Sequence, residues 1–206
     1  MTFVLPATKQ QALEQLARLI DRPPRSVGMG SAEPREALAE AAEVLGIATG
    51  DDWTKPQIAE AIASAGGLTW ENSCDSRDSP SGGGGTVTLE GLNRVVAAAL
   101  ALRTAPADSK QEALNRIAAL IGRPPRKVST GSTEPREAFT DVVDALQLDI
   151  NPALPKQELA EAIAKSGKQA WGQESDSRST ASGGGGTVTL VGLNRVLRAV
   201  GKLVLG

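Results

Sequence analysis

Two glycine-rich segments carry the residue types best suited to ligand chemistry. The string GGGGTVTL occupies residues 82–89 and recurs at residues 183–190. Glycines let backbone N–H groups approach a ligand closely, a helix that starts after them offers unpaired N–H groups, and threonines add hydroxyl donors. This combination predicts anion binding. No GK[ST] sequence is present, so the segment is not a nucleotide-binding P-loop, and a DNA phosphate is the better candidate. The alternative is a flexible linker before a Thr-capped helix.

The elements that position these segments are duplicated. Shifting the chain by 101 residues aligns residues 9–98 with 110–199 without a gap, and 46 of these 90 positions are identical. The repeat predicts a tandem pair of roughly 90-residue units, at residues 1–100 and 110–206, joined by a linker at 101–109. We expect two lobes related by a pseudo-two-fold operation.

Each copy reads as four helices. Apolar residues recur with helical spacing at residues 9–20, from about Ser31, from Thr54 and from Thr88. Ser31 and Thr54 are expected helix caps, and Thr54 with Gln57 forms a predicted capping box. Residues 70–85 read as a polar, extended loop. No segment of useful length alternates with period two, so the predicted fold class is all-α.

Basic residues persist between the copies better than acidic ones. Seven of eight basic residues in the first copy align with a basic residue in the second, whereas only six of thirteen acidic residues align with an acidic one. Drift on a solvated surface should erase both signs equally, so the pattern predicts an anion that both lobes bind. The alternative is that these residues cap helices or form salt bridges within a lobe.

The formal charge divides unevenly along the chain. The first copy carries −5 and the second, to the end of the chain, +3, which together give the net charge of −2. This balance argues against non-specific polyanion binding, which depends on a basic excess, but it allows a specific binder with its positive charge on one face. The second lobe is the expected stronger electrostatic partner.

The candidate nucleic-acid contacts combine the recurring basic residues with the glycine-rich helix entrances. Arginine and lysine suit phosphates and guanine edges, and asparagine near a helix start suits adenine or the DNA backbone. The predicted contacts in the first copy are Arg22, Arg25, Arg35, Lys55, Arg77, Gly84, Gly85, Thr86, Thr88, Asn93 and Arg94. Those in the second copy are Arg123, Arg126, Lys127, Arg136, Lys156, Arg178, Gly185, Gly186, Thr187, Thr189, Asn194 and Arg195.

Two further recurring features have structural interpretations. The Arg-Pro-Pro-Arg sequence at residues 22–25 and 123–126 lies between two predicted helices, so a rigid corner that projects two guanidinium groups is favoured over a polyproline ligand. Trp70 and Trp171 occupy matching positions after the third helix. We expect them to anchor the core or a hinge, with stacking on a ligand as the alternative.

The composition excludes several classes of function. The chain has no histidine, which removes the common zinc and haem ligand sets and every Ser-His or Cys-His catalytic arrangement. A single cysteine forms no intramolecular disulfide, and no segment reads as a membrane span or signal peptide. We expect a cytoplasmic protein without membrane association, cofactor or metal. Only Asp75 and Asp176 recur beside a glycine-rich loop, so a metal-dependent nuclease is the weakest hypothesis.

Parts of the repeat resemble nucleic-acid-binding families. The sequence TKPQIAEAIA at residues 54–63 resembles the second helix of SAP and Rho-N type modules, and this likeness implies that Lys55 and Lys156 face a nucleic-acid backbone. The GSxEPREA, TK-helix, tryptophan and TVTLxGLNRV elements together resemble helical DNA-recognition domains of prokaryotic restriction systems. No PD…(D/E)xK cluster is evident, so this resemblance implies a recognition part without a cleaving part.

The favoured hypothesis is a sequence- or modification-specific binder of double-stranded DNA. Two similar lobes can address the two halves of a pseudo-palindromic site from one chain. The alternative is a helical protein-interaction or scaffold module that binds no nucleic acid. The target sequence, an effector protein and any further oligomer remain open.

Overall fold

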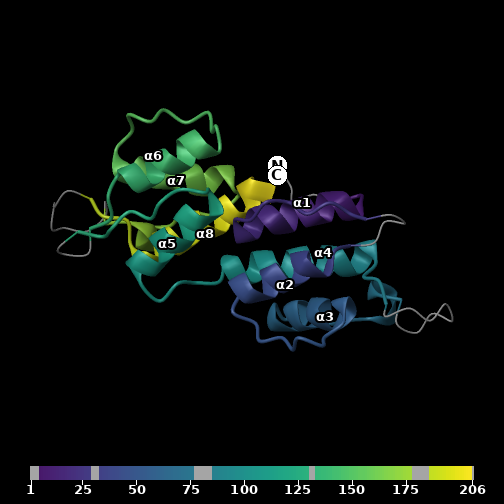
Figure 1. Cartoon of the computed structure of the whole chain (residues 1–206). Helices are drawn as coiled ribbons and strands as arrows, with labels where there is room; N and C mark the ends of the chain where they lie inside the picture. Colours follow the sequence, from purple (N-terminus) through teal and green to yellow (C-terminus); the bar gives the residue numbers. More distant parts are fainter. Residues whose placement is uncertain (1–4, 29–32, 77–84, 130–132, 178–185, 206) are drawn as a thin grey trace. The chain divides into compact units, whose positions relative to one another are not determined.

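The described residues form two helical units. A computed structural model describes residues 5–28, 33–76, 85–129, 133–177 and 186–205. One unit lies within Val4–Arg103 and the other within Thr104–Gly206, and we call them the N-terminal and C-terminal units (Figure 1). No β-strand occurs in the described ranges, which confirms the all-α prediction.

Both units contain the same elements in the same order. In the N-terminal unit these are α1 (Lys9–Ile20), α2 (Arg35–Val44), α3 (Lys55–Ala65), the short 3-10 helix η2 (Asn72–Cys74) and α4 (Leu89–Arg103). In the C-terminal unit they are α5 (Lys110–Leu120), α6 (Glu137–Ala145), α7 (Lys156–Ser166), η3 (Gln173–Ser175) and α8 (Leu190–Leu205).

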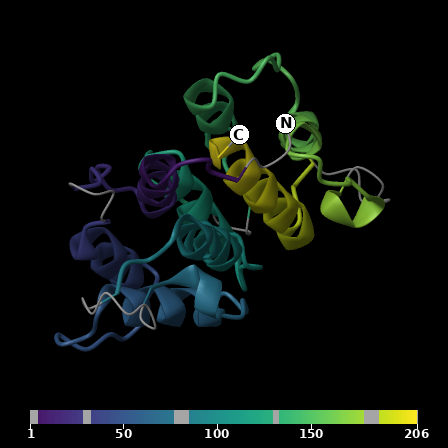
Figure 2. The same ribbon diagram turned by 90° about the vertical axis from the view of Figure 1, so that its right-hand side faces the viewer.

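The last helix is the centre of each unit. In the N-terminal unit α4 packs against both α1 and α3, and α2 contacts these two outer helices, as the two views show (Figures 1 and 2). In the C-terminal unit α8 packs in the same way against α5 and α7. The predicted apolar positions of residues 9–20 and of the helix from Thr54 are buried, as are Leu92, Val95 and Val96 on α4. Each unit therefore buries its own apolar core.

Helix boundaries follow the predicted signals with two exceptions. The bounds of α1 match residues 9–20, and Gln57 Oε1 accepts the N–H of Thr54 at 2.8 Å before α3. The helix expected from about Ser31 begins instead at Arg35, because Pro34 is extended and a proline disfavours helical geometry in the residue before it. Ser31 itself lies outside the described residues. The fourth helix, α4, also continues to Arg103, so the linker predicted at residues 101–109 begins three residues too early.

Backbone contact explains a recurring glycine in the central helices. The segment expected as a continuous loop contains η2 and η3, and each of these packs a carbonyl oxygen against the first turn of the central helix. A Cβ atom on Gly91 would lie 2.2 Å from Cys74 O, and one on Gly192 would lie 2.1 Å from Ser175 O. Since these neighbours are backbone atoms, only glycine fits without moving the chain.

A titratable carboxylate, that of Glu112, accepts a backbone hydrogen bond at the start of α5, whereas the neutral amide of Gln11 takes the same place at the start of α1. Ser109 Oγ accepts the N–H of Glu112 at 3.2 Å, and Glu112 Oε2 accepts the N–H of Asp108 at 2.9 Å. The backbone hydrogen bond from Asp108 is the main cause of the lowered pKa of Glu112, and Arg116 adds to it. At the α1 start Gln11 Oε1 accepts the N–H of Ala7 at 3.0 Å, with no carboxyl to titrate.

We expect Gly192→Ala to destabilise the C-terminal unit by about 1–3 kcal/mol, since the new methyl group overpacks against Ser175 O. In an open helix the same change would stabilise by roughly 0.5–1 kcal/mol. Urea unfolding measures the difference. Val191→Ala, at an exposed neighbouring position, is the control and should leave the midpoint unchanged. A stabilising Gly192→Ala would contradict the close backbone contact.

The Glu112 cap predicts a pH-dependent contribution to stability. Because the pKa of Glu112 is lower in the folded chain than in the unfolded chain, its contribution is complete above the unfolded pKa and is lost as pH falls through the folded one. Glu112→Gln should therefore weaken the acid-induced fall in the free energy of unfolding. The reverse change, Gln11→Glu, should strengthen it. Thermal unfolding between neutral and acid pH compares the three chains, and identical pH profiles would refute this role.

Candidate nucleic-acid interface

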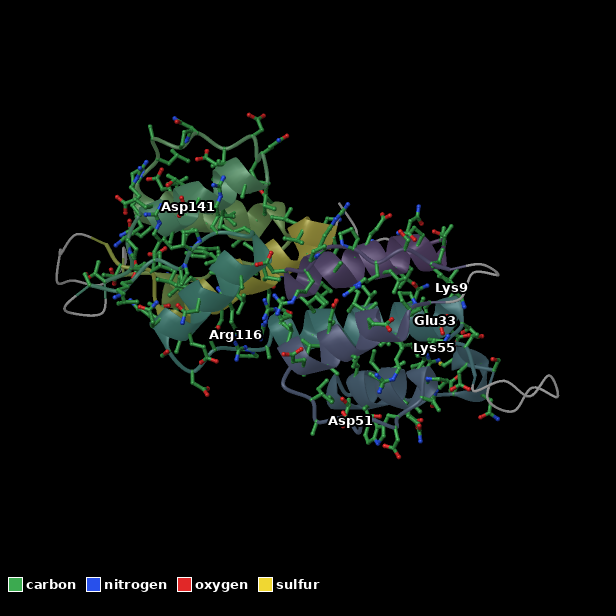
Figure 3. The ribbon with its side chains drawn as sticks, in the orientation of Figure 1. Lys9, Glu33, Asp51, Lys55, Arg116 and Asp141 are labelled. Carbon is green, nitrogen blue, oxygen red and sulfur yellow. The ribbon has the colours of Figure 1, made fainter. Side chains whose placement is uncertain are left out.

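A buried carboxylate joins three elements of the N-terminal unit. The Glu33 side chain is fully shielded from solvent, and its oxygens lie 3.0 Å from Lys9 Nζ and 3.2 Å from Lys55 Nζ. Glu33 Oε1 also accepts the N–H of Val87 at 2.8 Å. Figure 3 shows Glu33 between the two lysines. This cluster, which we call the glutamate clasp, fastens the starts of α1 and α3 to the segment that leads into α4.

The C-terminal unit contains the same clasp. The shielded Glu134 carboxylate lies 3.0 Å from both Lys110 Nζ and Lys156 Nζ, and it accepts the N–H of Val188 at 2.6 Å. In each unit the α3 or α7 lysine also donates to the glutamate's own carbonyl oxygen. Lys55 and Lys156, predicted as DNA contacts, therefore have ammonium groups held by a buried carboxylate.

Arg35 and Arg136 hold the loop between the second and third helices. The Arg35 guanidinium donates to Trp53 O and Asp51 O, both at 2.9 Å. Arg136 donates in the same manner to Leu154 O at 3.1 Å and to Pro152 O. Backbone carbonyls thus occupy the donors that we expected to face DNA.

The second arginine of each Arg-Pro-Pro-Arg sequence is paired with the following helix. Arg25 bonds Glu40 on α2, and Arg126 bonds both carboxylate oxygens of Asp141 on α6 at 2.7 and 3.0 Å. These hydrogen bonds to carboxylates are the main cause of the raised pKa of each guanidinium. Both arginines are exposed and both carboxylates are partly buried, so the chain neutralises these cations internally while leaving them accessible to solvent.

Arg94 and Arg195 bind back onto the 3-10 segment of their units. Arg94 pairs with Glu71 at 2.9 Å and Glu90 at 3.0 Å, and the hydrogen bond to Glu71 is the main cause of its raised pKa. Arg195 bonds Ser175 Oγ and pairs with Glu174. The pKa of Glu174 is lowered first by its own backbone N–H and then by Arg195.

The two asparagines tie the central helix to the segment before the first helix of each unit. Asn194 Oδ1 accepts the N–H of Ala107 at 2.8 Å, and its Nδ2 donates to Ala107 O at 3.2 Å. Asn93 Nδ2 donates likewise to Pro6 O at 3.2 Å. Because proline has no N–H, the buried Asn93 Oδ1 has no hydrogen-bond partner among the residues that the structure describes. Neither amide group points freely toward a ligand.

The described threonines and glycines also serve the fold. Thr88 Oγ1 accepts the N–H of Gly91 at 3.1 Å, and Thr189 Oγ1 accepts that of Gly192 at 3.2 Å, so both cap the central helix. Thr86 and Thr187 donate backbone N–H groups to Ser76 Oγ and Ser177 Oγ at 2.9 Å.

Gly85 has a φ of +67°, and a Cβ on Gly186 would overlap the Gln157 amide. Gly85 therefore occupies a position that favours glycine on structural grounds, whereas a side chain on Gly186 would require the Gln157 amide to move. The predicted contacts Arg77, Gly84, Arg178 and Gly185 lie outside the described residues.

The tryptophans bind the aspartates that directly follow the 3-10 helices η2 and η3. Trp70 Nε1 donates to Asp75 Oδ2 at 2.6 Å, and Trp171 Nε1 donates to Asp176 Oδ2 at 2.8 Å. Asp75 forms an isolated bridge with Val87, as Asp176 does with Val188. The indole thus anchors the aspartate that was considered for catalysis.

Three predicted cations lack such partners. Arg22, Arg123 and Lys127 are exposed, and none of them makes an ion pair or side-chain hydrogen bond within the described part of the chain. Arg22 and Arg123 line matching small hollows whose floors are apolar, formed in the N-terminal unit by Leu13, Leu16 and Ile20. Among the recurring cations in the described ranges, this pair alone is without an internal acceptor.

Glu33→Gln should destabilise the N-terminal unit by about 3–5 kcal/mol, because it leaves two partly buried ammonium groups without a carboxylate. Denaturant unfolding measures this loss. Glu36→Gln removes an exposed carboxylate that also recurs between the copies, and it should cost less than about 0.5 kcal/mol. Equal effects of the two substitutions would show that burial of the clasp carries no special weight.

Similarity to known proteins adds no assignment. Searches against protein-family models, curated proteins and solved structures found no match to the chain. In the described residues no helix is long and apolar enough to span a membrane, and no group of three or more His, Cys, Asp or Glu residues is placed to hold a metal ion.

Proposed function

We propose that the chain binds double-stranded DNA through the Arg-Pro-Pro-Arg corner of each unit, the two corners at residues 22–25 and 123–126. The observation that carries this proposal is the exposure of Arg22 and Arg123 without an acceptor among the described residues. The other described recurring cations have a carboxylate or a carbonyl group to bind. A guanidinium that recurs without such a role is best explained by an external anion, and phosphate is the anion that arginine binds most effectively.

Backbone contacts restrain the corner that carries this guanidinium. The backbone N–H of Arg22 donates to Ala17 O at 3.0 Å, and that of Arg123 donates to Ala118 O at 2.9 Å. Two prolines then restrict φ, which limits the conformations of the corner in the free protein. At its far end the N–H of Val27 donates to Gln10 Oε1, and that of Val128 donates to Gln111 Oε1. A restrained backbone loses less entropy on binding.

One corner per unit supports a two-part target. Phosphate contacts set the position and orientation of a protein on DNA, whereas base contacts carry sequence information. We propose that the two duplicated units are related by a pseudo-two-fold operation and that the two corners place them on the two half-sites of a pseudo-palindromic duplex. A cytoplasmic recognition protein without catalytic activity is the corresponding cellular role.

The hollows favour a second candidate, a protein-interaction module. Apolar residues line each hollow beside Arg22 or Arg123 and offer a contact surface to an apolar side chain of a protein partner, although a volume of about 10 Å³ is too small to enclose one. The two candidates differ in salt dependence. DNA binding weakens steeply with added salt as counterions are released, whereas burial of an apolar side chain changes little.

Fluorescence anisotropy with a random-sequence duplex pool, titrated at several salt concentrations, tests the DNA proposal. We expect Arg22→Ala/Arg123→Ala to weaken binding and to lower the slope of log K against log[salt] by about 1.8, or about 0.9 per lost phosphate contact. Arg18→Ala/Arg198→Ala removes two exposed arginines that do not recur, and it should change the slope less.

Failure of the wild-type chain to bind any duplex at low salt would refute the proposal. Equal effects of the two double variants would instead show that the corners have no special role. Binding to a protein partner that survives nuclease treatment and is lost in Arg22→Ala/Arg123→Ala would favour the second candidate.

A further inference from the structure

We infer that the two corners are not equivalent and that the C-terminal corner is the principal phosphate-binding one. This inference rests on the proposed DNA binding and concerns how the affinity is divided between the units. Its determinants are the residues that flank Arg-Pro-Pro-Arg on either side, Asp21 and Ser26 in one unit and Gly122 and Lys127 in the other.

The residue before the first arginine has the same backbone conformation in both units. Gly122 has a φ of +63°, the left-handed region in which glycine is favoured. Asp21 occupies the same region with a φ of +53°. The backbone geometry alone would therefore select glycine at both positions. The aspartate brings no side-chain bond in return, since its exposed carboxylate has no ion pair or hydrogen bond within the described residues.

The consequence of Asp21 is electrostatic. A carboxylate next to Arg22 lowers the positive potential that an approaching phosphate meets, whereas Gly122 leaves that of Arg123 intact. After the second arginine the difference has the same sense, because Ser26 is neutral and Lys127 is an exposed cation that has no partner in the described part of the chain. Two arginines and one aspartate give residues 21–26 a formal charge of +1, and two arginines and one lysine give residues 122–127 a charge of +3.

The remaining contacts of the corners do not offset this difference. Arg25 is paired with Glu40 and Arg126 with Asp141, each on the following helix. These two ion pairs are equivalent, so they do not change the difference in charge between the corners. The charge of the whole copies, −5 and +3, acts in the same direction at longer range. A phosphate is therefore bound more strongly at the C-terminal corner, and the N-terminal corner adds a weaker second contact.

Single substitutions in the full chain test the division of affinity. In duplex anisotropy titrations Arg123→Ala should weaken binding more than Arg22→Ala. The flanking residues are then exchanged in a variant with Asp21→Gly, Ser26→Lys, Gly122→Asp and Lys127→Ser, which keeps the net charge at −2. In this variant the order should reverse, so that Arg22→Ala becomes the more harmful change.

Partial exchanges give the magnitude and a control for folding. Asp21→Gly/Ser26→Lys should raise the salt slope by about 0.9, the value for one added phosphate contact, and Gly122→Asp/Lys127→Ser should lower it by about the same amount. Thermal unfolding of each variant verifies that the units remain folded. If the wild-type chain binds DNA but Arg22→Ala and Arg123→Ala weaken it equally, or if the exchange leaves their order unchanged, the inference is wrong while the proposed function stands. If the wild-type chain does not bind, the proposed function itself fails.

Discussion

The fold of each unit depends on a carboxylate that has no access to water. Removing a charge from water is costly, and Glu33 and Glu134 offset this cost with two lysines and one backbone N–H each. The bonded groups come from the start of the first helix, the start of the third helix and the segment before the fourth. Three elements far apart in the chain must therefore assemble in one register for the carboxylate to keep all its partners, and the loss of one partner leaves a buried charge uncompensated.

Local signals were sufficient for most of the helices but not for the contacts between them. The spacing of Leu13, Leu16 and Ile20 predicts α1 with correct bounds, because helix periodicity and caps act over a few residues. The start of α2 was predicted too early because Ser31 has the chemistry of a cap, whereas Pro34 decides where the helix begins. The 3-10 helices were missed because three residues are too few for a periodic pattern.

The candidate site shows why recurrence alone is ambiguous. Lys55 and Arg35 persist between the copies, and the sequence offers no means of knowing that their partners lie 22 and 18 residues away in the chain. Two lysines pair with each buried glutamate. Replacing one of these lysines leaves the carboxylate with fewer partners in a site without water, so the change is unfavourable unless the glutamate changes too. Persistence at these positions is thus explained by interdependence within the fold. Only the structure separates them from Arg22 and Arg123, whose exposure requires no internal partner.

Pro6, which precedes α1, makes one end of the N-terminal unit less tightly bonded than the matching end of the C-terminal unit. Asn194 forms two hydrogen bonds with Ala107, whereas Asn93 forms one with Pro6 and its buried oxygen finds no partner in the described ranges. The end of the N-terminal unit that enters α1 is therefore held less firmly to α4 than its counterpart is to α8. Local opening in native-state hydrogen exchange is easiest where such ties are fewest, so we expect the amide protons at the α1 entrance to exchange before those at the α5 entrance.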